Sequence, residues 1–474
     1  MNNSRIRGGR ELSLRVLALE SDWERLIAGI LPVKQANSIW RFSRPMRQSD
    51  PDQGWKIHVS ATVLTAARVL KRIAPALTRS NVLFKAASSL EELQRLNCGI
   101  FYGFSQVGKF ITVYPRNPAE AVAIARVLDR RLRGLGAPAV PYDLRYKSGS
   151  IFYRYGAFGN LEIEQPNGVR QPAVKMPDGN LLPDRREPGE AAPDWVVNPF
   201  LGRSGSVSKK TRAPSPLKTT VRVYQAVSQR GKGGVYLAVD TSVNPIRLCI
   251  LKEGRRHGET NWDGRDGYWR ARHEEKVLMT LRAAGVRVPE VYRSFKSGSN
   301  YYVAMELVDG VNLHALLQSS KKPISLRDAF RYGIQLAQMI ETIHAAGWVW
   351  RDCKPLNLLV TKRRSLRPVD FEGACLAVRN DTSPWGTPGY SPKESNDPTI
   401  VSRIPEDLYA LGATLYHLFT GRPSTPLNPL EGLDRSRQRT PVPIRLLITR
   451  LMSDDPGQRP AARTTRRILE QNRQ

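Results

Sequence analysis

The sequence contains little cysteine and no long apolar run. Its four cysteines are scattered over 474 residues and form no CxxC pair, which excludes a disulfide framework and argues against a structural zinc site. The first residues lack the apolar core of a signal peptide. No segment approaches the roughly 18 uninterrupted apolar residues that a membrane-spanning helix needs. We therefore expect a cytoplasmic protein without a membrane partner.

Acidic residues are scarce relative to basic ones. The chain has 73 Lys and Arg against 43 Asp and Glu, a net charge of +30. Residues 1–165 contribute +12 and residues 201–474 contribute +19, so the excess is not confined to a tail. Such a surface attracts many anions, including nucleotides, phosphopeptides and nucleic acid. Nucleic-acid association is the weakest hypothesis because no DNA- or RNA-binding motif accompanies the charge, and we expect no nucleic-acid partner.

One segment divides the chain. Residues 176–217 are rich in Pro, Gly, Ser and charge, which predicts a linker between a domain of residues 1–175 and a domain of residues 218–474. Before the linker, β-type runs alternate with amphipathic helical patterns, which predicts a small α+β domain. We expect its strands at 55–61, 81–84, 109–115 and 150–158, and its helices at 62–77 and 119–135.

The second domain has a different order of elements. Strand-like segments run to about residue 307, and long amphipathic helical patterns follow at 325–347 and 406–420. This order predicts a β-rich lobe followed by a helical lobe.

Several motifs of the second domain fit phosphoryl transfer. The segment 348–360 holds Asp352, Lys354 and Asn357. Such a reaction needs a carboxylate to orient the attacking hydroxyl, a cation for the transferred phosphate and an amide oxygen for a metal ion. Asp370 follows Asp352 by 18 residues and is expected to be the main Mg²⁺ ligand, because hard oxygen ligands suit that ion.

A nucleotide site is expected upstream of these residues. Lys252 lies on a strand of alternating apolar residues, and Glu274, within a helical pattern, is placed to pair with it. A glycine-rich turn with Gly231, Gly233 and Gly234 precedes them and is expected to cover the nucleotide.

Residues 218–470 therefore resemble a protein kinase. The resemblance implies a bilobal fold, ATP or GTP together with Mg²⁺ as cofactors, and a nucleotide-binding hinge that includes Glu306 and Val308. Two departures leave a pseudokinase as the alternative: Trp350 stands where kinases usually have histidine, and Glu372 follows the Asp-Phe pair. Activity is favoured because the Lys, Asp and Asn residues named above are all present.

The first domain has a row of basic residues on its expected strands. Alternation places Lys56 and His58 on one face of their strand, opposite its apolar residues. From these two alone, a solvent-facing polar edge is the simpler interpretation. Lys85, Lys109 and Arg154 lie within or beside other apolar strand segments. Converging cations without a carboxylate partner predict a site that grips a dianion such as phosphate, and crowding lowers the pKa of each lysine.

The segments GWKIHVSAT, GKFITVYP, PYDLRY, FYRYGAF and DRREPGEAAPDWVVNPF resemble the N-terminal region of class III lanthionine synthetases. In that family a phosphoserine/phosphothreonine lyase domain precedes a kinase domain, and the resemblance covers nearly all of residues 20–470. It implies that Lys85 removes the Cα proton, that His58 protonates the departing phosphate and that Lys56 stabilises charge on the carbonyl group.

The same resemblance implies a phosphate-binding group. Its members would be Lys109, Tyr114, Arg116 and Arg154. Phe104 stands where the family usually carries a phosphate-binding arginine, which leaves a degraded lyase as the alternative.

A kinase and a lyase together form a peptide dehydratase. Phosphorylation converts a Ser or Thr hydroxyl into a good leaving group, and elimination then gives dehydroalanine or dehydrobutyrine by general acid–base catalysis. The expected partner is a precursor peptide with a Ser/Thr-rich core and an acidic leader. The competing hypothesis is a signalling Ser/Thr kinase whose N-terminal domain binds phosphopeptides without lyase activity.

Class III synthetases normally continue into a cyclase domain. The sequence ends at Gln474, directly after the last expected kinase helix, so we expect no such domain. Three alternatives follow: a separate cyclase acts as a further partner, the product stays dehydrated, or another enzyme closes the ring.

Overall fold

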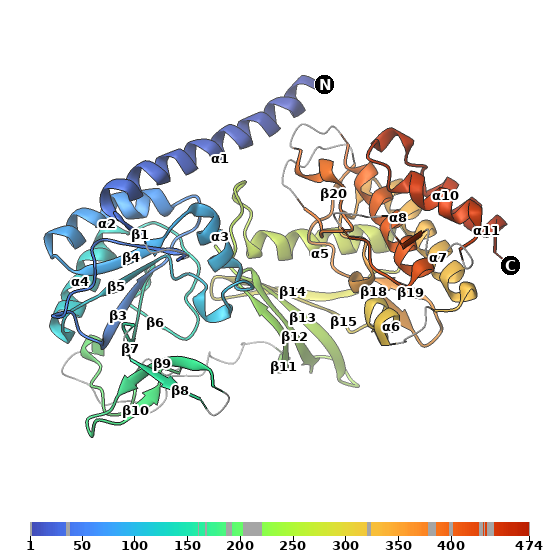
Figure 1. The fold of residues 1–474 in the computed structure, drawn as a ribbon. Coiled ribbons are helices and arrows are strands. Elements are labelled where there is room, and N and C mark those ends of the chain that lie inside the picture. Colours follow the sequence, from blue (N-terminus) through green and yellow to red (C-terminus); the bar gives the residue numbers. More distant parts are fainter. Residues whose placement is uncertain are drawn as a thin grey trace.

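The protein is described here by a computed structural model, and the described residues are 2–34, 38–159, 161–165, 168–185, 192–201, 220–319, 324–377, 385–397, 402–425, 430, 432–433 and 440–473. They form an α+β domain on the left of Figure 1 and a bilobal domain on the right. This is the fold class expected from the sequence.

A seven-stranded antiparallel sheet forms the centre of the first domain, in the order β1-β2-β4-β5-β3-β7-β6. Its strands are β1 (Val33–Lys34), β2 (Trp40–Phe42), β3 (Gln53–Val59), β4 (Leu83–Ala87), β5 (Ile111–Tyr114), β6 (Leu144–Arg145) and β7 (Ile151–Ala157). The four strands expected from the sequence correspond to β3, β4, β5 and β7, with bounds that differ by at most three residues.

Helices cover one face of this sheet. They are α1 (Asn2–Ile30), α2 (Ala66–Arg79), α3 (Leu90–Cys98) and α4 (Pro118–Arg131), with a short 3₁₀ turn η1 (Phe104–Gln106). The side chains of Ser89 and Asn117 cap the first turns of α3 and α4. Alternate strand residues such as Ile57, Phe84 and Val113 belong to the apolar core and are at most 1% exposed. The residues between them therefore project from the opposite face.

The first domain extends beyond the boundary expected from composition. β8 (Glu162–Glu164), β9 (Arg170–Lys175) and β10 (Leu181–Pro183) form a three-stranded sheet, and a 3₁₀ turn η2 (Pro199–Leu201) follows. Phe200 stacks on Tyr153 with ring centroids 3.9 Å apart. The described residues from 176 to 201 thus belong to this domain, because Pro- and Gly-rich composition does not distinguish a hairpin from a linker. The rest of the expected linker, residues 186–191 and 202–217, lies outside the described residues.

The second domain begins with a five-stranded sheet in the order β11-β12-β13-β15-β14, packed against one helix. These elements are β11 (Val221–Arg230), β12 (Gly233–Asp240), β13 (Arg247–Gly254), α5 (Gly267–Ala283), β14 (Val291–Ser297) and β15 (Asn300–Glu306).

A mainly helical lobe follows, as expected from the sequence. Its helices are α6 (Leu313–Ser319), α7 (Leu326–Ala345), α8 (Ile404–Thr420), α10 (Val442–Leu451) and α11 (Ala462–Gln471). Its short strands and 3₁₀ turns are β16 (Gly310–Asn312), β17 (Trp348–Val349), η3 (Pro355–Asn357), β18 (Leu358–Thr361), β19 (Leu366–Pro368), β20 (Cys375–Leu376), η4 (Lys393–Asn396) and η5 (Pro456–Gln458). Within the described ranges, every helix is too short or too polar to cross a bilayer.

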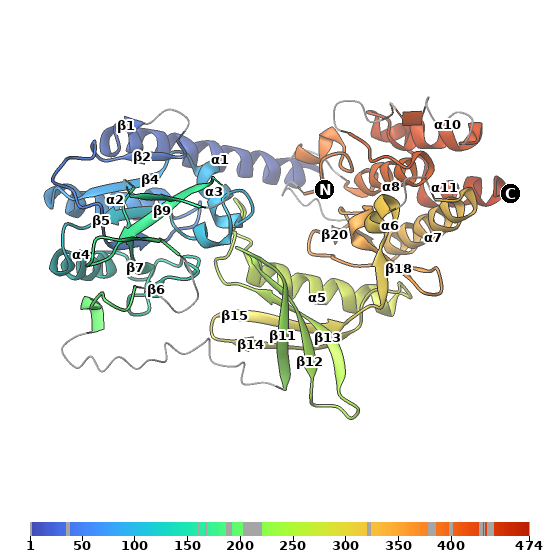
Figure 2. The same ribbon diagram turned by 60° about the horizontal axis from the view of Figure 1, so that its bottom comes forward.

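The two domains touch between the end of α3 and the turn that joins β11 and β12. The backbone N–H of Gly231 donates to the carbonyl oxygen of Cys98 at 2.9 Å. The guanidinium group of Arg255 lies over the ring of Phe104, 4.9 Å from its centroid. Trp262, between β13 and α5, packs against the apolar core of the first domain. Helix α1 starts beside the second domain and ends on the first (Figures 1 and 2).

Candidate functional site

Lys252 and Glu274, which the sequence predicts to pair, form an ion pair. Lys252 on β13 donates to both carboxylate oxygens of Glu274 on α5, at 2.6 and 2.8 Å, and its Nζ lies 3.4 Å from Oδ1 of Asp370. Burial alone would lower the pKa of Lys252, but attraction to Asp370 and Glu274 outweighs it and raises that pKa. Burial also opposes ionisation of Asp370, yet Lys252 and Lys232 lower its pKa to about 2. Lys252 is therefore charged and the Asp370 carboxyl ionised at neutral pH.

The catalytic-loop residues form one hydrogen-bonded group. Lys354 Nζ lies 2.9 Å from both carboxylate oxygens of Asp352 and 2.6 Å from the hydroxyl of Thr387. That hydroxyl in turn donates to Asp352 at 2.9 Å. Asn357 donates its amide N–H to Asp352 at 2.7 Å, which fixes the amide and leaves its oxygen for a ligand.

The nucleotide cleft lies between the two lobes and has a volume of about 500 Å³. The expected hinge residues Glu306 and Val308 line it, together with Lys252, Asn357 and Asp370. The oxygens of Asn357 and Asp370 suit a Mg²⁺ ion held jointly with nucleotide phosphates. No group of three or more His, Cys, Asp or Glu side chains among the described residues is placed to hold a metal ion by itself.

The glycine-rich turn is placed differently from the expectation. Gly233 and Gly234 line the nucleotide cleft. Gly231 instead faces the first domain, where an added Cβ would lie only 1.6 Å from the backbone oxygen of Asn97. The close approach of the two backbones explains the glycine at this position.

Both departures from the kinase pattern have clear structural roles. The indole N–H of Trp350 donates to the backbone oxygen of Asp370 at 2.9 Å, and its ring stacks on Phe371 with centroids 4.9 Å apart. Glu372 directly follows Phe371, lines the nucleotide cleft and forms an ion pair with Lys232 at the tip of the glycine-rich turn. Trp350 therefore orders the segment that carries Asp370, and Glu372 holds the turn over the cleft.

The second site is a cavity of about 350 Å³ on the face of the N-terminal sheet that carries the non-core strand residues. We call it the basic pocket after five of its lining residues, Lys56, His58, Lys85, Lys109 and Arg154. Their convergence follows from strand register. Lys56 on β3 lies opposite Arg154 on β7. His58 on β3 and Lys85 on β4 both lie opposite Thr112 on β5, the strand between them.

The expectation that these cations lack a carboxylate partner was wrong. Asp143, whose side chain is fully buried, forms a hydrogen bond with Nδ1 of His58 and lies 3.7 Å from Nζ of Lys109. Burial lowers the pKa of His58 to about 3, although Asp143 pulls it the other way. Burial alone would raise the pKa of Asp143, but His58 and Lys109 lower it to about 2. At neutral pH the imidazole is neutral, donates through Nδ1 and turns Nε2 away from Asp143.

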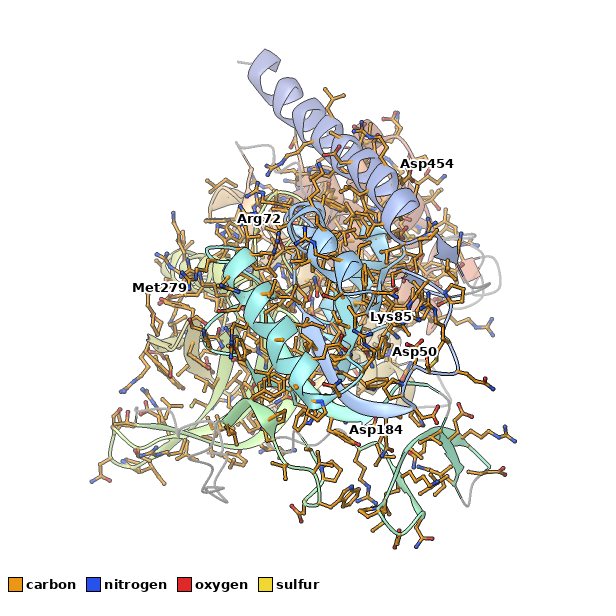
Figure 3. The ribbon with its side chains drawn as sticks, turned by 90° about the vertical axis from the view of Figure 1, so that its left-hand side faces the viewer. Asp50, Arg72, Lys85, Asp184, Met279 and Asp454 are labelled. Carbon is orange, nitrogen blue, oxygen red and sulfur yellow. The ribbon has the colours of Figure 1, made fainter. Side chains whose placement is uncertain are left out.

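A second carboxylate, from the segment after β10, pairs with two of the residues that line the pocket. Asp184 accepts a hydrogen bond from Arg154 at 2.5 Å and lies 3.6 Å from Nζ of Lys56. Figure 3 labels Asp184 together with Lys85 on this domain. Isolated buried cations are costly, so the two acids explain how the basic side chains stay close together without a ligand.

Lys85 has aromatic neighbours. Its Nζ lies 4.5 Å from the centroid of the Trp40 ring and 5.8 and 5.9 Å from those of Phe42 and Tyr114. Aromatic faces attract an ammonium group and fix its position. The lysine is therefore held at a defined point of the pocket.

The remaining expected phosphate ligands do not all reach the pocket. Tyr114 lines it, and burial raises the pKa of its hydroxyl, which therefore remains a donor. Arg116 lies outside, since β5 ends at Tyr114 and the guanidinium group pairs with Glu120 of α4. Phe104 is also outside, because its ring faces Arg255 of the second domain.

Sequence reasoning missed three side chains of the two sites. Asp143 had a detectable signal, because it lies within the segment PYDLRY. Asp184 had no such signal, because the composition of the surrounding sequence predicts a linker. Thr387 also had a signal, because it lies within the segment GTPGYSPKE, which resembles the end of a kinase activation segment.

The bilobal domain, with Lys252, Glu274, Asp352 and Asp370 in this arrangement, has the fold and the nucleotide cleft of a protein kinase. A family model described as "Protein kinase domain" matches residues 229–468, and one described as "RamC, N-terminal domain" matches residues 32–212. The chain belongs to the protein kinase family and carries a RamC-type N-terminal domain, which is the domain order of the class III synthetases that its sequence resembles.

Curated relatives agree with this assignment. A probable SapB synthase of Streptomyces coelicolor is 30% identical over 84% of the chain and 42% of its own length. The serine/threonine-protein kinase PknA of a Nostoc species is 29% identical over 44% of the chain and 38% of its own length. The serine/threonine-protein kinase PknB of Mycolicibacterium smegmatis is 33% identical over 32% of the chain and 29% of its own length. The chain thus spans about two fifths or less of these relatives.

Proposed function

We propose that this chain is a peptide dehydratase that phosphorylates Ser and Thr side chains of a precursor peptide and then eliminates the phosphate. The observation that carries the proposal is the basic pocket, which sits in a RamC-type domain directly upstream of a complete kinase site. The similarity to a probable SapB synthase supports a biosynthetic role over a signalling one.

In the first step, Asp352 orients the substrate hydroxyl for attack on the γ-phosphoryl group of ATP, and Lys354 stabilises that group during transfer. Lys252, held by its glutamate partner, binds the nucleotide phosphates. Asn357 and Asp370 would hold a Mg²⁺ ion, which would neutralise charge on the phosphates. The peptide leaves this site as a phosphoserine or phosphothreonine.

In the second step, Lys85 takes the Cα proton of the phosphorylated residue. The electron pair of that bond forms the Cα–Cβ double bond, the Cβ–O bond breaks, and phosphate leaves with a proton from His58. Lys56 stabilises the negative charge that develops on the carbonyl oxygen. Lys109 and Arg154 bind the phosphate oxygens.

His58 becomes an acid only when substrate is bound. In the empty pocket its pKa is about 3, so the imidazole is neutral near pH 7. A phosphate dianion beside Nε2 adds negative charge to a positive pocket, which raises the pKa of His58 and allows proton uptake. Asp143 holds the ring so that Nε2, rather than Nδ1, faces the leaving group.

The experiment compares wild type with Lys85→Ala. Each protein is incubated with ATP, Mg²⁺ and a Ser/Thr-rich peptide encoded beside its gene, and separately with a synthetic phosphothreonine peptide, and products are read by mass spectrometry. We expect loss of one water per modified site with wild type and a stable phosphopeptide with the variant. Lys71→Ala, an exposed lysine on α2, is the matched control. If wild type and Lys85→Ala give the same phosphopeptide, the lyase assignment fails and the signalling kinase remains.

A further inference from the structure

A third cavity, of about 620 Å³, lies between the two domains, and we call it the inter-domain cleft. Phe104, Tyr142 and Arg145 line its wall on the first domain, and Arg256 and His257 line its wall on the second. A volume of this size accommodates a ligand as large as a short peptide segment.

The described residues that line the inter-domain cleft include arginines but no carboxylates. Of the three arginines in the lining, Arg255 pairs with Glu253. No described carboxylate forms an ion pair with the other two, Arg145, which lies over the ring of Phe152 at 4.8 Å, and Arg256. These two guanidinium groups come from opposite walls, so they suit an elongated ligand with several negative charges rather than one small anion.

The cleft adjoins both sites through neighbouring residues of the chain. On the 3₁₀ turn η1, Phe104 lines the cleft whereas Gln106 lines the basic pocket. Tyr142 lines the cleft whereas the next residue, Asp143, binds His58. In the second domain, Gln229 on β11 lines the inter-domain cleft. The residues before and after it, Ser228 and Arg230, line the nucleotide cleft. A ligand held here therefore lies between the two sites.

The backbone on both walls is strained. Tyr142 has a φ of 66° and His257 a φ of 61°, in the left-handed region that bulky residues rarely adopt. Such conformations persist where the surrounding structure imposes them, and they cluster at binding sites. Both walls thus show strain where an anionic ligand would bind.

We propose that the inter-domain cleft binds an acidic segment of the peptide substrate and holds it while the Ser and Thr residues visit the two sites. The inference rests on the proposed function for the identity of the ligand as a peptide substrate. Arg145 and Arg256 bind carboxylates of the segment, and Phe104 and Tyr142, whose rings meet edge to face at 6.0 Å, form an apolar floor for its backbone.

The test measures binding to the full chain without catalysis. The probe is a short fluorescein-labelled peptide in which Glu alternates with Ala, compared with its Gln counterpart by fluorescence anisotropy at physiological salt. The variant is Arg145→Glu/Arg256→Glu. The control is Arg133→Glu/Arg363→Glu, two exposed arginines outside the cleft, which changes the net charge by the same amount.

We expect the cleft variant to weaken binding of the Glu peptide at least about tenfold and the control less than about twofold. Equal weakening by both variants would mean that overall charge attracts the peptide, and the proposal would be wrong. Displacement of the peptide by inorganic phosphate at equal concentration would overturn it too.

A second measurement separates this proposal from the proposed function. Both variants should eliminate phosphate from a phosphothreonine peptide without acidic residues at the wild-type rate, because the cleft is not part of the basic pocket. A tenfold loss in the cleft variant would show damage to the fold and overturn the assignment. If wild type itself eliminates nothing, the dehydratase proposal fails, and the anisotropy result still decides whether the cleft binds acidic peptides.

Discussion

Around the kinase catalytic loop carboxylates outnumber lysines, whereas in the basic pocket cations outnumber carboxylates. The first set comprises Asp352, Asp370, Glu274 and Glu372 against Lys232, Lys252 and Lys354. The second comprises Lys56, Lys85, Lys109 and Arg154 against Asp143 and Asp184. Two sites proposed to handle the same chemical group thus have opposite electrostatics.

The difference matches the charge of each proposed ligand. A nucleoside triphosphate brings several negative charges to a site that is already negative, so divalent cations have to bind with it. A phosphorylated side chain brings two negative charges to a pocket whose cations outnumber its carboxylates among the described residues, even with Lys85 neutral as the proposed base, so the protein itself supplies the neutralising charge. The comparison therefore predicts that phosphorylation depends on a metal ion and that elimination does not.

Metal removal is expected to have the largest effect. Excess EDTA should lower phosphorylation of a Ser/Thr peptide at least about a hundredfold, because charge stabilisation by the metal is worth several kcal/mol. Elimination from a synthetic phosphothreonine peptide should change less than about twofold. Both rates are followed by mass spectrometry, and Mg²⁺ added back in excess of the chelator is the control. Loss of both activities in EDTA would contradict the comparison.

Asp143→Asn should act on elimination alone. The amide that replaces the Asp143 carboxylate can donate as well as accept a hydrogen bond, so it no longer requires an N–H at Nδ1 of His58. His58 therefore loses its fixed tautomer and its orientation. We expect the elimination rate to fall roughly tenfold to a hundredfold, within the range of general acid catalysis, with an altered pH–rate profile and unchanged phosphorylation. Asp22→Asn, at a half-exposed site on α1, is the matched control. An unchanged pH profile would show that Asp143 does not act through His58.

The same comparison shows what the sequence could predict. The alternation of apolar and polar residues predicts the strands and the shared face of Lys56 and His58. The order of the motifs predicts the pairing of Lys252 with Glu274. Both are local properties of the sequence. The two acids of the basic pocket follow from neither. Asp184 reaches Arg154 from 30 residues further along the chain, through a hairpin whose composition resembles a linker. Contacts of this kind depend on how the chain folds back, which no local pattern records.

Asp184→Asn should strengthen phosphate binding and weaken the fold. The substitution leaves Arg154 and Lys56 without their carboxylate, so the pocket gains one positive charge. We expect inorganic phosphate to inhibit elimination several-fold more strongly. Without phosphate, the free energy of unfolding should fall by about 1–3 kcal/mol, because buried cations lose a charged partner. Inhibition assays and urea denaturation with and without phosphate measure both effects. Weaker inhibition would mean that Asp184 helps to bind phosphate rather than taking its place.

The smallest effect concerns stability at mild acid pH. The pKa of His58 is about 3 in the folded protein against 6.5 for an ordinary histidine. Between these values the unfolded chain binds a proton that the folded chain does not, so this group makes stability rise with pH and costs stability as pH falls below 6.5. At pH 5 the cost reaches at most about 2 kcal/mol. His58→Gln removes the group, so wild type should lose up to that much more stability than the variant between pH 7 and pH 5 in urea denaturation. Parallel losses would show that His58 accepts a proton in the empty pocket, in which case burial and the neighbouring lysines do not keep the imidazole neutral until a dianion arrives.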